Sequence, residues 1–137
     1  MDRFVFLEDE ATADVAFIAT GKTKAEIIEN ACWALTNVIT DGALVEPNIE
    51  YQKEFRAEDL LGLVYDVLNY IVFLFDTDDI LFKTFSIALD EENFSLRLKA
   101  IGETYDESKH DIKTHVKAVT FFGMEFTETS LKVTLDL

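Results

Sequence analysis

The stretch Val15-Ala16-Phe17-Ile18-Ala19-Thr20-Gly21-Lys22-Thr23-Lys24-Ala25-Glu26 passes from one kind of secondary structure to another. Its first half is rich in β-branched, aromatic and small residues, which is typical of a strand, and Gly21 ends the extended run. Thr23 and Glu26 then match the capping box, in which the Thr side chain caps a helix and the Glu three residues later reaches back. A strand that leads directly into a helix indicates a fold of mixed α and β structure.

The helix that begins after Thr23 is predicted to reach Ile39. Apolar residues recur at the i, i+3, i+4 spacing of one helix face: Ile28, Ala31, Cys32, Leu35, Val38 and Ile39. We expect Asp41-Gly42 to end this helix, with Gly42 supplying a left-handed residue. Upstream, Phe4–Leu7 has the composition of a first strand.

Downstream, Ile49–Phe55 alternates as a strand, and Ala57-Glu58-Asp59 places acids at the start of a second helix. The apolar stripe from Leu60 to Phe75 is broad, which predicts a deeply packed helix that stops at Asp76–Asp79.

Two hairpins are predicted in the last third of the chain. The first joins Ile80–Leu89 to Phe94–Ile101, and Gly102–Asp111 follows as a polar loop. The second joins Lys113–Phe122, with a bend at Gly123, to Ser130–Leu137. The order ββαβαββββ, without regular alternation of strands and helices, indicates an α+β fold. We expect one domain, residues 1–137, built as a two-layer sandwich with both helices on one face of a largely antiparallel or mixed sheet.

The charge of the chain limits its partners. There are 27 acidic and 12 basic residues, which gives a net charge of −15. Nucleic acid would be repelled, because affinity for phosphate comes from Lys and Arg. An acidic surface suits a basic protein partner or bound cations, although it also simply keeps a protein soluble.

The expected location is the cytoplasm. No basic segment followed by an apolar one is present near Met1, and the longest apolar run, Ile71–Phe75, is too short to cross a bilayer. The single cysteine, Cys32, forms no intramolecular disulfide, and its place on an apolar helix face predicts a packed thiol.

Two carboxylates near opposite ends of the sequence form the leading candidate site. Asp14, in Thr12-Ala13-Asp14-Val15, and Asp136, in Thr134-Leu135-Asp136-Leu137, each adjoin strand residues. If those strands pair, both acids and the terminal carboxylate of Leu137 would form a cluster of oxygens suited to a hard divalent cation. The alternative is that Asp14 ends a strand and Asp136 is solvated.

Other candidates are weaker. Lys117 lies in an apolar segment, where it either protects a strand edge or pairs with a carboxylate. His110 and His115 could form a metal pair or act as acid and base, but histidines beside a polar loop are usually solvated. Trp33 is expected to be a half-buried packing residue. Templates for nucleotide-binding loops and nucleophile elbows are absent.

Taken together, these pieces resemble the archease family in order and spacing over nearly the whole chain. The matching segments are Thr12–Val15, Gly21–Thr23, Thr40-Asp41, Asp59–Leu61, Leu68-Asn69, Leu74–Thr77, Gly102-Glu103, His110–Lys113, Val116–Thr120 and Leu135–Leu137. One departure is Glu10-Ala11, where the family usually has an Asp-His pair.

The resemblance implies a protein that is not itself an enzyme but activates the RNA ligase of tRNA splicing, promoting its guanylylation and its repeated turnover. It implies that Asp14, Asp136 and Leu137 hold a divalent cation, calcium first, with manganese or magnesium as alternatives. Lys117 would be the basic residue needed for activation, and Asp41 would be an acid near the rim of the metal site. Two other readings stay open: a chaperone for a tRNA methyltransferase, and a small metal-dependent hydrolase.

Overall fold

The computed structural model describes residues 3–7 and 14–137, so Thr12, Ala13, Glu10 and Ala11 lie outside the described residues. The predicted order of strands and helices is confirmed. The elements are β1 (Phe4–Leu7), β2 (Val15–Thr20), α1 (Lys24–Ile39), a short 3-10 turn η1 (Gly42–Leu44), β3 (Ile49–Arg56), α2 (Leu60–Asp78), β4 (Ile80–Asp90), β5 (Ser95–Thr104), β6 (Ala118–Phe126) and β7 (Ser130–Asp136).

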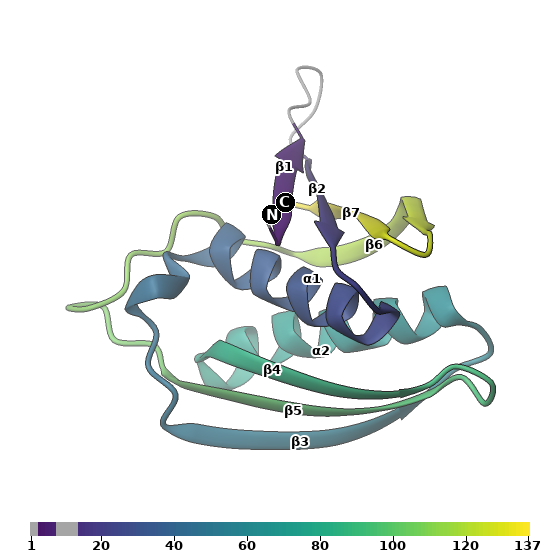
Figure 1. Ribbon diagram of the computed structural model, residues 1–137. Helices are drawn as coiled ribbons and strands as arrows, with labels where there is room; N and C mark the ends of the chain where they lie inside the picture. The colour runs from purple at the N-terminus through teal and green to yellow at the C-terminus, as the bar shows by residue number, and fades with distance from the viewer. Residues whose placement is uncertain (1–2, 8–13) are drawn as a thin grey trace.

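The strands form two antiparallel sheets, one in the order β1-β2-β7-β6 and the other in the order β3-β5-β4. Both helices lie between the sheets (Figure 1) and contact each of them. The α+β class is therefore confirmed, but three layers replace the expected two. The reason is visible on α1, where Ile27 and Ala34 are fully buried in addition to the predicted stripe. One sheet could not cover so wide an apolar surface.

The start of α1 is confirmed, and its end differs from the prediction. The Thr23 hydroxyl accepts a hydrogen bond from the Glu26 amide at 3.1 Å, while Glu26 accepts one from the amide of Lys22. At the other end the capping residue is Thr40, in extended conformation. Gly42 instead begins η1. A Cβ there would lie 2.5 Å from the Trp33 ring, so packing against Trp33, and not a left-handed backbone, requires glycine.

Helix α2 is the longer of the two helices, and one of its faces is buried. Asp59 caps it by accepting a hydrogen bond from the Gly62 amide at 2.7 Å, and Asp79 ends it with a left-handed φ of 57°. By length and composition alone α2 could cross a membrane, since its mean hydropathy is 1.5. In this fold Val64, Val67 and Leu68 are fully buried between the sheets instead.

The segment before β6 corrects a second expectation. Residues 113–117 were predicted as part of a strand, but β6 begins only at Ala118. The backbone of this segment is bonded to the end of α1: the Lys113 amide donates to the Ile39 carbonyl at 2.8 Å, and the Thr40 hydroxyl donates to the Asp111 carbonyl at 2.7 Å. The predicted bend at Gly123 is confirmed by its φ of 64° and by a register shift between Thr120 and Glu125.

Candidate functional site

Sheet register brings three of the predicted site residues to one end of the four-stranded sheet. Val15 on β2 lies opposite Leu135 on β7, so the next residues along these strands are Asp14 and Asp136. On the other side of β7, Ala118 lies opposite Asp136, and the Lys117 amide donates to the Asp136 carbonyl at 2.9 Å. In Figure 1 the C-terminus accordingly lies beside the N-terminal strands. Asp14, Asp136 and Lys117 therefore come from three neighbouring segments of one sheet end.

The side chains at this end divide between core and solvent. Leu135 is fully buried and Asp136 is exposed, as the alternation in β7 predicted. The side chain of Leu137 packs against the core, which fixes the position of the residue beside Asp136. Lys117 is exposed, and in residues 3–7 and 14–137 no carboxylate lies within ion-pair distance of its ammonium group. Of the two alternatives for Lys117, pairing with a carboxylate side chain is not seen among these residues.

Asp41 lies apart from the other candidates. Its carboxylate accepts a hydrogen bond from the Ala43 amide at 3.0 Å and so caps η1. A groove of about 260 Å³ separates the start of β2 from the last turn of α1, and it is lined by Phe6, Leu7, Val15, Asn37, Val38, Lys113 and Thr114. Asp14 precedes Val15 and Asp41 follows Val38 by three residues. Neither acid is among the residues that line the groove.

The donor set at the sheet end suits a hard cation. Asp14 and Asp136 offer carboxylate oxygens, the ligands that calcium, magnesium and manganese prefer. Among the described residues there is no group of three or more His, Cys, Asp or Glu side chains that could hold a metal ion. The predicted ligand set therefore stays as the sequence suggested it: the side chains of Asp14 and Asp136 and a carboxylate at Leu137. Water or a partner protein would have to complete the coordination of a cation held there.

His110 is buried, which corrects the expectation of a solvated histidine. Only 1% of its surface is exposed. Its Nδ1 accepts a hydrogen bond from the Asp106 amide at 3.0 Å, so its Nε2 carries the hydrogen that it shares with Glu103 at 2.9 Å. Both ring nitrogens are thus occupied within the protein, and no metal pair with the exposed His115 forms.

Glu103 is the centre of a partly buried polar cluster that sequence reasoning missed. It also accepts hydrogen bonds from the Lys109 ammonium and from the Glu46 amide, at 2.8 Å for the latter. Burial alone would raise the pKa of Glu103, but the bonds from Lys109, Glu46 and His110 together hold it below its ordinary value. This cluster fixes the loop that leads to Lys117. No local pattern in the sequence marks it, because Glu46, Glu103 and His110 belong to different elements.

Two further expectations are confirmed. Cys32 is fully buried, and burial raises the pKa of its thiol, which makes it a poor nucleophile. Trp33 is half-buried, and its ring lies 5.2 Å from both the Arg3 guanidinium carbon and the Lys83 ammonium nitrogen. Trp33 thus packs against these two cationic side chains, in agreement with the predicted packing role.

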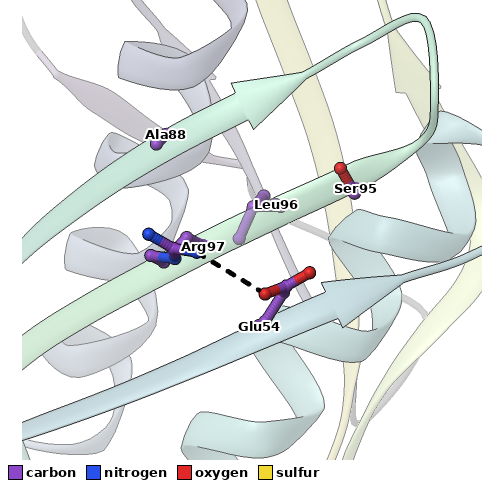
Figure 2. A pocket seen from close by; sticks show the side chains of 5 residues that line it. All are labelled: Glu54, Ala88, Ser95, Leu96 and Arg97. Carbon is purple, nitrogen blue, oxygen red and sulfur yellow. Dashed lines mark ion pairs between the residues drawn. The ribbon is translucent and has the colours of Figure 1, made fainter.

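A second hollow, of about 180 Å³, lies on the three-stranded sheet and is lined by Glu54, Ala88, Ser95, Leu96 and Arg97 (Figure 2). Its charges are paired, since Glu54 and Arg97 lie 3.6 Å apart. Both side chains are largely exposed, so this pair contributes little stability. The hollow belongs to the other sheet and adds nothing to the carboxylate site.

Comparison with known proteins places the chain in a family. The model of the archease protein family matches residues 4–137. Protein archease of Methanothermobacter thermautotrophicus is 40% identical over 134 residues, which cover 93% of this chain and 95% of that protein. Protein archease of Sulfolobus acidocaldarius is 36% identical over 124 residues, covering 90% and 88%. The solution structure of Methanobacterium thermoautotrophicum protein 1598 superposes over the whole of both chains with a TM-score of 0.82 at 38% identity. The family resemblance expected from the sequence is confirmed, and the chain belongs to the archease family.

Proposed function

We propose that this protein is a non-enzymatic, cytoplasmic activator of the RNA ligase that joins tRNA halves. It would promote guanylylation of the ligase and its repeated turnover. The observation that carries the proposal is the convergence of Asp14, Asp136 and Lys117 at one end of the four-stranded sheet. A divalent cation, calcium or alternatively manganese or magnesium, would be held by Asp14, Asp136 and the carboxylate of Leu137.

Each residue of the candidate site would have a separate role. When bound, the cation would supply positive charge for phosphate oxygens at the ligase active site. Asp136, exposed at the last position of β7, would present it outward, while the packed Leu137 keeps the strand end in place. The exposed Lys117 ammonium would bind a phosphate or a carboxylate of the ligase–nucleotide complex. Asp41, at the end of α1, would help to orient the ligase at the edge of this site.

The acidic character of the protein supports a partner that binds RNA. A ligase needs Lys and Arg to bind phosphate, and a protein of net charge −15 would be steered toward such a surface. A small hydrolase is less well supported, because both ring nitrogens of His110 are already occupied by hydrogen bonds within the protein.

The test is a guanylylation assay with purified ligase, GTP and metal ion, with and without this protein. We expect more ligase–guanylate and many more turnovers when the protein is present. Equal yields with and without it would refute the proposal. A chaperone for a methyltransferase would instead raise the yield of that soluble enzyme, and replacing Asp14 or Asp136 would leave this effect unchanged.

A further inference from the structure

Strand β6 exposes two consecutive aromatic residues. Phe121 is 53% exposed and Phe122 is 79% exposed. Successive residues of a regular strand face opposite sides, so one of the two should point toward the core. Large apolar side chains held in water in this way are typical of interaction sites when they are grouped.

The backbone of β6 explains why two consecutive side chains are both exposed. The register with β7 shifts between Thr120 and Glu125, and Gly123 has a φ of 64°. Residues other than glycine rarely adopt this left-handed conformation. Beyond the bulge the strand returns to the core at Met124, which is 7% exposed. The exposure of Phe121 and Phe122 therefore follows from the irregular backbone at Gly123.

Phe121 is also held in place by a second aromatic residue. The ring of Tyr65 on α2 stacks on it with 4.2 Å between centroids and 6° between planes. A ring fixed before binding loses little conformational entropy when a partner covers it. Tyr65 on α2 and the neighbouring Phe121 and Phe122 on the edge strand thus form an aromatic patch, in which the Tyr65–Phe121 pair is preorganised.

The charge of the chain favours a basic occupant. Asp66 is exposed next to Tyr65 on α2, and Glu125 follows Phe122 by three residues on β6, where Lys132 of β7 is its cross-strand partner. The protein as a whole carries a net charge of −15. A second copy of this chain would place acids against acids, and an anionic membrane surface would be repelled. A protein surface rich in Lys and Arg around an apolar pocket is complementary.

We infer that Tyr65, Phe121 and Phe122 form a docking surface for the basic RNA-binding surface of the ligase, separate from the carboxylate site. This inference rests on the proposed function. Lys117 precedes Phe121 by four residues, about 13 Å along a strand. One partner can therefore contact the patch and the carboxylate site together. Aromatic residues of this kind contribute most of the affinity in many interfaces.

The test compares Phe122→Ser with Val5→Ser, which alters an apolar residue of 51% exposure on β1, the opposite edge of the same sheet. Binding to immobilised ligase is measured by interferometry, and guanylylation is measured at increasing concentrations of each variant. For Phe122→Ser we expect an unchanged melting temperature, at least tenfold weaker binding, and half-maximal stimulation at a correspondingly higher concentration, with the same maximum. Phe122→Tyr should restore binding, and Val5→Ser should behave as the wild type.

Three results would overturn the docking surface: equal binding by Phe122→Ser and the wild type, no binding by the wild type, or a wild-type dimer in solution that Phe122→Ser converts to a monomer. A wild type that binds through Phe122 but fails to stimulate guanylylation would refute the proposed function alone. The binding and activity measurements therefore separate the two proposals.

Discussion

The side-chain amide of Asn69 on α2 binds both backbone groups of Val119 on β6. Its Oδ1 lies 2.9 Å from the Val119 nitrogen, and its Nδ2 lies 3.1 Å from the Val119 oxygen. An edge strand leaves such outward groups without a partner strand, and here one amide takes that place. Because Val119 is two residues from Lys117, this contact also fixes the start of β6 where the candidate site lies.

Replacing Asn69 with Ala removes both hydrogen bonds from partly buried backbone groups. We expect the free energy of unfolding to fall by about 1–3 kcal/mol, as measured by urea denaturation. Thr77→Ala, at an exposed residue of the same helix, is the control and should change stability by less than about 0.5 kcal/mol. A loss for Asn69→Ala no larger than that of the control would show that the contact contributes nothing.

The proposed metal site predicts that Asp14→Ala and Asp136→Ala each weaken calcium or manganese binding in calorimetry, with native circular dichroism spectra. In the wild type, free metal at a hundredfold excess over Kd should raise stability by about 2.7 kcal/mol. Asp66→Ala, at an exposed acid of α2, is the matched control. Unchanged affinity in both site variants would remove these residues from any metal site.

Lys117→Ala should separate activation from folding. The side chain is exposed and unpaired with described residues, so we expect a stability change of less than about 1 kcal/mol. If Lys117 contacts the ligase or its nucleotide, stimulation of guanylylation should be lost while metal binding is retained. Lys22→Ala, at another exposed lysine, should stimulate normally. Normal stimulation by Lys117→Ala would exclude the residue from the functional site.

The Glu103 cluster predicts a particular acid sensitivity. Its pKa is held below the ordinary value of 4.5, so its contribution to stability is present above pH 4.5 and is lost as the pH falls through the lower value of the folded state. Glu103→Gln should cost about 1–3 kcal/mol at pH 7 and should reduce the fall in stability between roughly pH 5 and 3. Glu107→Gln, at an exposed residue of the same loop, should do neither.

Local features of the fold were predictable because they depend on neighbours in sequence. The cap at Thr23 and the bend at Gly123 follow from side-chain and backbone preferences within a few residues. The prediction that Gly42 is needed for a left-handed backbone is wrong. Glycine is needed there because the Trp33 ring of the preceding helix leaves no room for a Cβ atom. The division of the strands into two sheets could not be predicted either. Alternation within a strand shows which face is buried, but it does not show which other strand it pairs with.

The candidate site was likewise predictable only in part. Strand alternation placed Asp136 on the polar face, the expected pairing of strands added Asp14, and the family resemblance gave Lys117 its role. The burial of His110 was missed because its partner Glu103 belongs to β5 and comes from a different segment. Residues 113–117 have strand composition, yet the carbonyl of Ile39 takes the Lys113 amide. The first outcome depends on contacts with residues four and seven positions away, across a loop without regular structure, and the second on a contact with a distant helix.

The position of β7 between β2 and β6 has a consequence for how the chain folds during synthesis. Residues 15–20 leave the ribosome early, but their neighbour in the sheet is made only when residues 130–136 follow. Contacts between such distant segments slow folding. Until then the helices can be covered on one side by the β3-β5-β4 sheet alone, which leaves apolar surface on α1 and α2 open to chaperones.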